Sequence, residues 1–136
     1  MGIHYLNSRY VLTLLSARRR HIPGSLDHQL VEWIWKNRAG IGYLGANNRQ
    51  PEPFHIFNWI ESLEILSRFK SWRKLGREAL AWLWEQRDQD GTWDFGMKVS
   101  KSFYFPLSDD WRKAGRRAMD HTTRVLTLLS NYDPSL

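Results

Sequence analysis

The sequence predicts an all-α protein, a single domain of 136 residues built from repeated helical hairpins. Three observations predict this class. Apolar residues recur at helical spacing in five segments, a six-residue string occurs twice, and a second motif alternates with that string. Because positions three and four residues apart share one face of a helix, each segment has a face to bury against a neighbouring helix.

The five helices are expected at 5–19, 25–38, 54–69, 74–86 and 120–129. Pro23 and Gly24 separate the first two, and Ser25 or Asp27 is the expected N-cap of the second. A short helical turn is expected at 109–117, before the fifth helix. The apolar stretch at 99–106 is expected to form an ordered loop, since it has no partner strand.

Two short elements alternate along the chain. Element A reads VLTLLS at both 11–16 and 125–130, with a weaker copy, SLEILS, at 62–67. Element B reads WIWKNR at 33–38 and WLWEQR at 82–87, and a glycine follows four residues after each copy, at Gly42 and Gly91. The order A-B-A-B-A, with a spacing of about 50 residues, is typical of arrays of helical hairpins.

Composition narrows the class of site. The chain has no cysteine, which excludes disulfides, thiolate zinc sites and thiol nucleophiles. No apolar run approaches the roughly 20 residues that cross a bilayer, and residues 1–5 do not read as a secretory signal. We therefore expect a cytoplasmic protein. Aromatic residues make up 14% of the chain, so the core or the wall of a cavity is rich in rings.

A net charge of +6 favours an anionic partner. The basic residues cluster at 18–21, 68–77 and 112–117. Each cluster lies near an expected helix end or on a polar face, where solvated Lys and Arg are common. A solvated surface is the simpler interpretation and an anion site is the alternative, with nucleic acid not the first choice of partner.

The second copy of element B continues into a recognisable motif. An apolar helix is followed by Gln86 and then by Asp90-Gly91-Thr92-Trp93. This resembles the QW motif of squalene and hopene cyclases and of the related prenyltransferase and squalene oxidase repeats. The resemblance implies an α/α toroid in which Gln86, Asp90, Gly91 and Trp93 join a helix end to the next hairpin. The first copy keeps Gly42 but has Leu44 where Trp93 aligns.

The start of the third A element, at Asp120-His121-Thr122, resembles the inner-helix start of the same superfamily. The resemblance to triterpene cyclases implies a catalytic acid at Asp120 with His121 beside it. The resemblance to protein prenyltransferases implies a zinc ligand at His121. The other zinc ligands there include Cys, which this chain lacks, so no metal and no cofactor are expected. The structural alternative is that Asp120 is an N-cap and His121 a polar residue of the first turn.

An aromatic set is the candidate lining of an apolar site. Ring faces stabilise cations and suit isoprenoid chains, and ordinary core packing is the alternative. The candidate ligand-binding residues are Phe57, Trp59, Phe103, Tyr104 and Trp111. Asp109 and Asp110 precede a short helical turn, where they either cap it or hold Mg²⁺.

Length sets the last expectation. A closed toroid stacks five to seven hairpins, at about 50 residues each, and this chain supplies two and a half. We expect an incomplete barrel, either the C-terminal part of a longer toroid or a short protein that covers its edges by self-association. The leading hypothesis is a terpenoid-cyclase or prenyltransferase-like domain that binds an apolar, isoprenoid-like molecule, whether or not it is an enzyme. The alternative is a non-catalytic helical-repeat module for protein interaction or self-assembly.

Overall fold

The computed structural model describes residues 6–36, 40–42, 44, 51–98 and 110–132. In this part of the chain the regular structure is helical and no strand is present, so the all-α prediction is confirmed. The α-helices are α1 (Arg9–Ala17), α2 (Gly24–Trp35), α3 (Ile56–Leu66), α4 (Trp72–Leu75), α5 (Arg77–Glu85) and α6 (Ala114–Tyr132). Two 3₁₀ turns, η2 (Arg19–His21) and η3 (Pro53–His55), precede α2 and α3.

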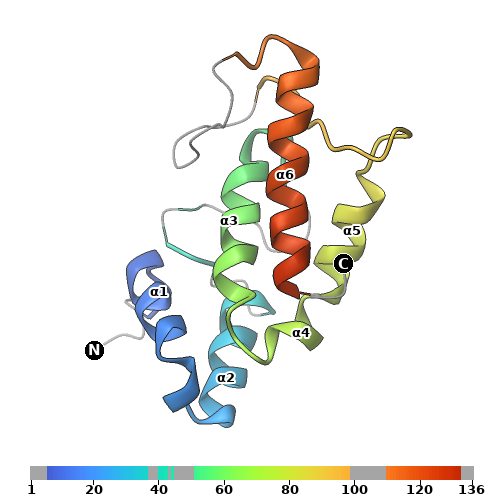
Figure 1. Cartoon of the computed structure of the whole chain (residues 1–136). Coiled ribbons are helices and arrows are strands. Elements are labelled where there is room, and N and C mark those ends of the chain that lie inside the picture. The colour runs from blue at the N-terminus through green and yellow to red at the C-terminus, as the bar shows by residue number, and fades with distance from the viewer. Residues whose placement is uncertain (1–5, 37–39, 43, 45–50, 99–109, 133–136) are drawn as a thin grey trace.

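The three copies of element A lie on α1, α3 and α6, which run in the same direction with α3 between the other two (Figure 1). The central helix α3 contacts both neighbours, and every one of its residues except Glu64 is buried. Element B lies on α2 and α5. The chain therefore alternates between a row of parallel A helices and the helices that connect them.

The second B segment is two helices, α4 and α5, where one was predicted. Gly76 separates them, because the ring of Trp72 lies against its backbone. A Cβ on Gly76 would come within 2.3 Å of Cε2 of Trp72. The same ring meets that of Trp35 edge to face at 4.8 Å, which ties α4 to α2. The break therefore makes room for a Trp-Trp contact between the connecting helices.

Asp27 joins α2 to the beginning of α4. Its side chain was one of two expected N-caps of the second helix, but that prediction is wrong: the N-cap is Pro23, and it makes no side-chain hydrogen bond. Asp27 is buried, and its carboxylate instead accepts hydrogen bonds from the backbone N–H groups of Lys70 (3.2 Å) and Ser71 (2.9 Å) and from the Ser71 hydroxyl. The carboxylate of Asp27, from α2, thus caps the N-terminus of α4.

The first helix is shorter than predicted and starts at a clear cap. The Ser8 hydroxyl accepts a hydrogen bond from the backbone N–H of Val11 at 3.2 Å. Just before it, the carbonyl of Asn7 accepts from the backbone N–H of Gly42 at 2.9 Å, so the segment after α2 returns to the beginning of α1. The loop expected at 99–106 lies outside the described residues.

The last helix begins earlier than predicted. Residues 114–132 form one continuous helix, and the expected short turn merges with it from Ala114 onward. Asp120 therefore lies inside α6, buried, and is not the N-cap. The backbone before α6 bends at Trp111, whose carbonyl accepts a hydrogen bond from Arg117 at 2.9 Å. That bond lies across the first turn and favours an earlier helix start.

The copies of element A differ in burial at their second position. Leu12 in α1 and Leu63 in α3 are both fully buried, at 0% exposure, whereas Leu126 in α6 is 49% exposed. Both α1 and α3 have another A helix after them in the row, and α6 has none among the described residues. The second position therefore faces the next A helix.

The fourth position shows the opposite order. Ile65 in α3 and Leu128 in α6 are 4% and 0% exposed, whereas Leu14 in α1 is 70% exposed. Residues two apart on an α-helix project about 200° apart, to nearly opposite sides. The fourth position therefore faces the preceding A helix, and the row has one uncovered side at each end.

Candidate functional site

Asp120 and His121 lie side by side in the sequence on the second turn of α6, and both side chains are buried. Their helix is amphipathic, with Val125, Leu128 and Leu129 buried farther along it. A buried carboxylate and a buried imidazole are costly unless they have hydrogen-bond partners. The partners of these two residues define the site.

Asp120 is paired with Trp111, one of the residues that the aromatic pattern singled out. The indole Nε1 of Trp111 donates to Oδ2 of Asp120 at 2.6 Å. Both side chains are buried, and a hydrogen bond to a carboxylate in such surroundings is among the stronger kinds in proteins. This bond places the Trp111 ring over the second turn of α6.

His121 is held by the backbone of the segment after α5. Its Nδ1 accepts a hydrogen bond from the backbone N–H of Phe95 at 3.0 Å. Since Nδ1 is the acceptor, a neutral ring carries its proton on Nε2. Burial lowers the pKa of His121 from 6.5 to about 4, even though the carboxylate of Asp94 acts to raise it. The imidazole is therefore neutral at pH 7.

The Nε2 atom of His121 is buried and has no hydrogen-bond partner among the described residues. Three aromatic rings surround the imidazole. Phe57 and Trp111 meet it edge to face with centroids 4.9 and 4.7 Å away, and Phe95 stacks on it at 5.6 Å. The Nε2 atom therefore lies in an aromatic environment with no hydrogen-bond acceptor among the described residues.

A second layer holds this group from outside. Arg117 forms two hydrogen bonds to the carboxylate of Asp94, at 2.6 and 2.7 Å. The hydrogen bond from Arg117 lowers the pKa of Asp94, which also accepts from the backbone N–H of Gly96 at 2.9 Å. Asp94 Oδ1 lies 3.8 Å from Nδ1 of His121. The ion pair between Arg117 and Asp94 fixes the Trp93–Gly96 segment against α6.

Ion pairs also join the three A helices. Arg124 donates to both carboxylate oxygens of Glu64, at 3.0 and 3.1 Å, and its guanidinium lies 5.5 Å from the centre of the Phe57 ring. One turn earlier on the same face of α3, Glu61 lies 2.6 Å from Arg9 of α1. Burial raises the pKa of Glu61, although Arg9 acts against that change. Each end helix is thus tied to α3 by one arginine.

The predicted site residues divide into three sets. Phe57, Trp111, Asp120 and His121 come together as described. Trp59 is buried on the same helix as Phe57, but its ring meets Trp82 of α5 at 5.2 Å and takes no part in the His121 group. Phe103 and Tyr104 lie outside the described residues.

Asp94, Phe95 and Arg117 are essential to the arrangement and were not predicted as site residues. Each contact that brings them in joins positions far apart in sequence, 26 residues for Phe95 and His121 and 23 for Asp94 and Arg117. The one available signal for Asp94 and Phe95 was their position directly after Trp93, in the segment that leads from α5 toward α6.

The Gly91–Trp93 segment lies at a corner between helices. Gly91 has a φ of 87°, a conformation that favours glycine, and Asp90 accepts hydrogen bonds from the N–H and hydroxyl of Thr92. The buried indole of Trp93 donates to the carbonyl of Leu83 in α5 at 2.7 Å, and its backbone N–H donates to Oγ1 of Thr122 in α6 at 2.9 Å. Trp93 therefore links α5 to α6.

Gln86, by contrast, is exposed at the C-cap of α5, and its side chain makes no hydrogen bond to another described residue. Trp93 packs instead near Trp84, with ring centroids 5.6 Å apart. The corner is thus held by the Trp93 indole and backbone.

A neutral His121 supplies no proton at pH 7. Neither it nor Asp120 lines either of two surface pockets, one of about 930 Å³ at the ends of the A helices and one of about 540 Å³ between α5 and α6. No group of three or more metal-binding side chains occurs in the described part of the chain. Asp110 accepts hydrogen bonds from the backbone and side chain of Arg112, which lowers its pKa, and Asp109 lies outside the described residues.

Comparison with known proteins gives no match for this chain among family models, curated proteins or solved structures. Within the described residues, no helix combines the length and apolar character needed to span a bilayer.

Proposed function

We propose that the chain is a helical-repeat module that assembles with a second copy of itself through the uncovered sides of α1 and α6. The observation that carries this proposal is that α1 and α6 expose different positions of element A. The same string exposes Leu14 in α1 and Leu126 in α6, at positions that α3 buries on both of its sides. Each exposed leucine thus lies where an A helix packs elsewhere in the same molecule.

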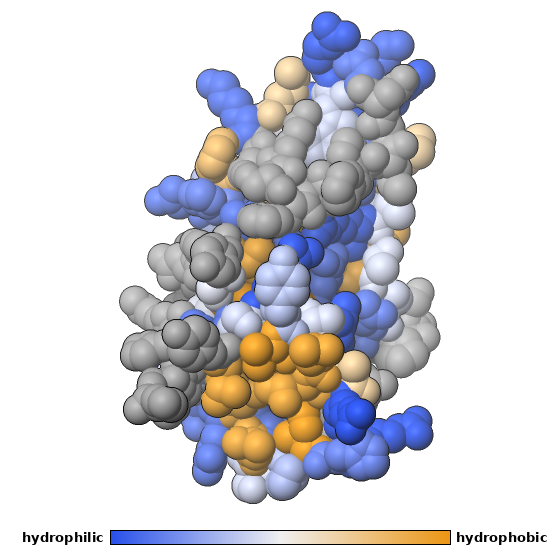
Figure 2. Space-filling view, turned by 90° about the vertical axis from the view of Figure 1, so that its left-hand side faces the viewer, coloured by the Kyte–Doolittle hydropathy of each residue, from blue (hydrophilic) through white to orange (hydrophobic). Residues whose placement is uncertain are grey.

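The α1 side is apolar over more than one residue. Tyr10 and Leu14 are 76% and 70% exposed, and they lie one helical turn apart, on one face. Leu6 and Leu26 are exposed as well. Figure 2 shows apolar residues gathered on the side of the molecule where α1 lies. A contiguous apolar surface of this kind is a common mark of a protein interface.

The α6 side carries a shallow groove of about 540 Å³ between α5 and α6, lined by Trp84, Thr123, Leu126, Thr127, Leu129 and Ser130. Met119, 66% exposed, lies two turns before Leu126 on the same face. Apolar side chains on an edge helix find a complementary surface in the groove. This side is therefore equipped to receive a helix.

A second copy fits because the two sides are complementary in kind. In the α1–α3 pair, a second-position leucine of one helix faces the fourth-position side of the next. If α6 of one copy takes the place of the first helix and α1 of another that of the second, the same contact forms. With a two-fold axis parallel to the helices, two copies satisfy both sides and leave none open. The resulting ring has six A helices, which is the closed toroid that the sequence resemblance implies.

The test is sedimentation equilibrium of the full chain and of Leu14→Lys. The wild-type protein is expected at twice the mass of one chain, and the variant as a monomer. Burial of a leucine contributes about 1.5–3 kcal/mol, so its loss weakens each contact by roughly tenfold to a hundredfold. Met97→Lys is the matched control, because it adds the same charge at an exposed apolar residue outside the helices.

A monomeric wild-type protein, or equal weakening by Leu14→Lys and Met97→Lys, would contradict assembly through α1. Circular dichroism of each variant separates loss of association from loss of folding. Leu14 is mostly exposed, so its replacement should leave the helical signal unchanged.

A second candidate function is the binding of an apolar, isoprenoid-like molecule next to Asp120, as in terpenoid cyclases and prenyltransferases. The specific support is the group of Phe57, Phe95 and Trp111 around His121, with a carboxylate beside it. The probe is farnesol, followed by tryptophan fluorescence, together with a cyclisation or transfer assay on Asp120→Asn. Saturable quenching that Trp111→Phe removes would support the site. Quenching or turnover unchanged in both variants would exclude it.

A further inference from the structure

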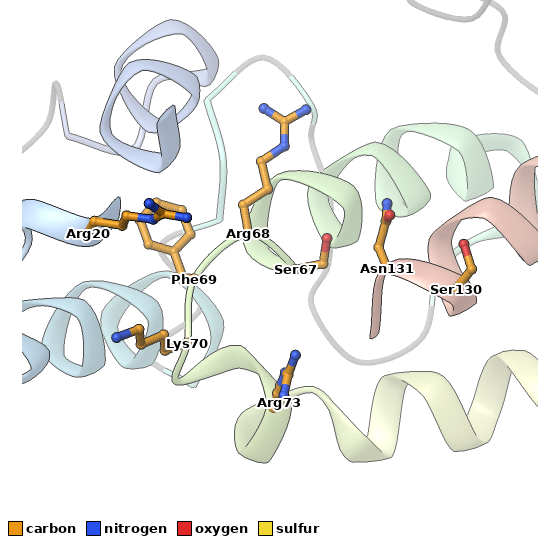
Figure 3. Close-up of a pocket in the computed structure, with 8 residues that line it drawn as sticks. All are labelled: Arg20, Ser67, Arg68, Phe69, Lys70, Arg73, Ser130 and Asn131. Atoms are coloured by element: carbon orange, nitrogen blue, oxygen red, sulfur yellow. The ribbon is translucent and has the colours of Figure 1, made fainter. Parts of the chain in front are cut away.

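A basic pocket of about 930 Å³ lies where the three parallel A helices end (Figure 3). Arg20 enters it from η2, Lys70 and Arg73 from the α3–α4 turn and α4, and Asn131 from the last turn of α6. Arg68 also lines it, and no carboxylate residue does. Four basic residues and no acidic one therefore line this pocket.

Pairing distinguishes the basic residues of this pocket from the three arginines that tie neighbouring segments together. Arg9, Arg117 and Arg124 each have a carboxylate partner within 3.1 Å. Arg20, Lys70 and Arg73 form no ion pair with a carboxylate of the described residues. No carboxylate of the described residues therefore compensates the charge of Arg20, Lys70 and Arg73 by an ion pair.

The dipoles of the helices that end here offset part of this positive charge, but not all of it. The C-terminal ends of α1, α3 and α6 point toward the pocket, and each carries an effective charge of about −0.5, which attracts cations. Three such ends, together about −1.5, do not balance the three cations Arg20, Lys70 and Arg73. The backbone carbonyl of Arg73 accepts a hydrogen bond from the Tyr132 hydroxyl. A positive potential therefore remains in the pocket.

The polar neighbours indicate which groups would bind. The hydroxyls of Ser67 and Ser130 donate to the carbonyls of Glu64 and Thr127, both at 2.8 Å, so they are not donors toward the pocket. In Figure 3 the guanidinium of Arg73 points toward Ser67 and Asn131, while Arg20 approaches from the far side of Arg68. Recognition would therefore rest on guanidinium and ammonium groups, which bind phosphate oxygens well.

We propose that this pocket binds the phosphate groups of a multiply charged ligand, with Arg20, Lys70 and Arg73 as its principal contacts. The volume lies within the range of small-molecule sites and exceeds what a single phosphate fills. Phe69, buried at the pocket wall, adds an apolar surface beside the cations. Either a soluble polyphosphate compound or the headgroup of an anionic lipid presents this chemistry.

The first experiment titrates the full chain with inorganic triphosphate by isothermal calorimetry. Saturable binding is expected at low salt, with affinity that falls as sodium chloride is added. Arg20→Gln and Arg73→Gln should each lower the affinity roughly tenfold, since each removes charge-assisted hydrogen bonds. Arg77→Gln is the matched control: it removes the same charge from exposed α5, outside the pocket, and should change the affinity by less than about twofold.

The second experiment distinguishes the source of the phosphate. Vesicles of phosphatidylcholine alone and with phosphatidylinositol bisphosphate, whose headgroup carries several phosphates, are sedimented with the protein and the same variants. Retention on the anionic vesicles that Arg73→Gln abolishes and Arg77→Gln preserves identifies a headgroup, and triphosphate binding without retention identifies a soluble ligand. No binding in either experiment, or equal loss in Arg77→Gln, overturns the proposal. Leu14 and Leu126 do not line the pocket, so the association test is independent of this one.

Discussion

Leu14 and Leu128 occupy the same position of two identical six-residue strings, yet Leu14 is 70% exposed and Leu128 is fully buried. Local sequence cannot cause this difference, because it is the same at both places. The cause is the neighbour: α6 has α3 on that side, whereas α1 has no A helix there among the described residues. The surface at the fourth position of element A is therefore packed in α6 and exposed in α1.

Trp93 is expected to be the main tie between α5 and α6. Trp93→Phe removes the donor to the Leu83 carbonyl and part of a buried ring, and should lower the free energy of unfolding by about 2 kcal/mol. Urea denaturation measures the change. Trp84→Phe is the matched control, because Trp84 lies on α5 near Trp93 but is partly exposed. Equal losses in the two variants would contradict a special role for the Trp93 contact.

The Trp111–Asp120 hydrogen bond is expected to couple the two residues energetically. Trp111→Phe and Asp120→Leu each remove this buried hydrogen bond, which costs about 1–3 kcal/mol. The double variant removes both, so its loss should be smaller than the sum, with a coupling energy of about 1–3 kcal/mol. Additive losses in a double-mutant cycle would show that the bond contributes nothing beyond packing.

His121 is expected to make stability depend on pH. Its pKa is about 4 in the folded protein and about 6.5 when unfolded, so between these values the unfolded chain binds more protons. The free energy of unfolding therefore falls as pH decreases from 7 toward 4, by roughly 3 kcal/mol at most. Of the charged groups facing the ring, Asp94 has a lowered pKa and stays ionised over this window, and Arg117 keeps its charge. Asp120 is the third charged group that faces the ring, and its carboxylate acts to raise the pKa of His121.

The comparison for this prediction is His121→Gln, which has an acceptor for the Phe95 N–H but no titration. Urea denaturation at several pH values should show a shallower decline for the variant. The same decline in both proteins would assign the pH dependence to other groups.

Asp27 and Ser25 offer a direct comparison between an expected cap and an observed one. Asp27→Ala leaves two backbone N–H groups without their acceptor, which should reduce stability by about 2–4 kcal/mol. Ser25→Ala removes a side chain that caps nothing in α2 and should change stability by less than about 0.5 kcal/mol. The reverse ranking in thermal or urea unfolding would contradict the capping of α4 by Asp27.

The helical class and the repeats were predictable from sequence because they depend on local spacing. The break at Gly76 was not, because it depends on where the Trp72 ring packs. Asp120 was a reasonable N-cap from residue type, but its bond to Trp111 and the contacts of Arg117 extend the helix past it. Tertiary contacts decided both cases.

The candidate site was predictable only in part for the same reason. Phe57, Trp111, Asp120 and His121 were identified from aromatic content and from resemblance, and they do come together. Phe95 and Asp94 reach His121 through the corner at Trp93, whose path no periodic pattern encodes.

The most direct test of assembly mixes two variants that each lack one side, Leu14→Lys and Leu126→Lys. Neither variant has a matching pair of sides by itself, so each alone should sediment as a monomer. Together, the intact α6 of the first should bind the intact α1 of the second and give a heterodimer at twice the mass of one chain. If Leu126→Lys alone remains a dimer, or if the mixture stays monomeric while the wild type associates, the α6-to-α1 contact is wrong.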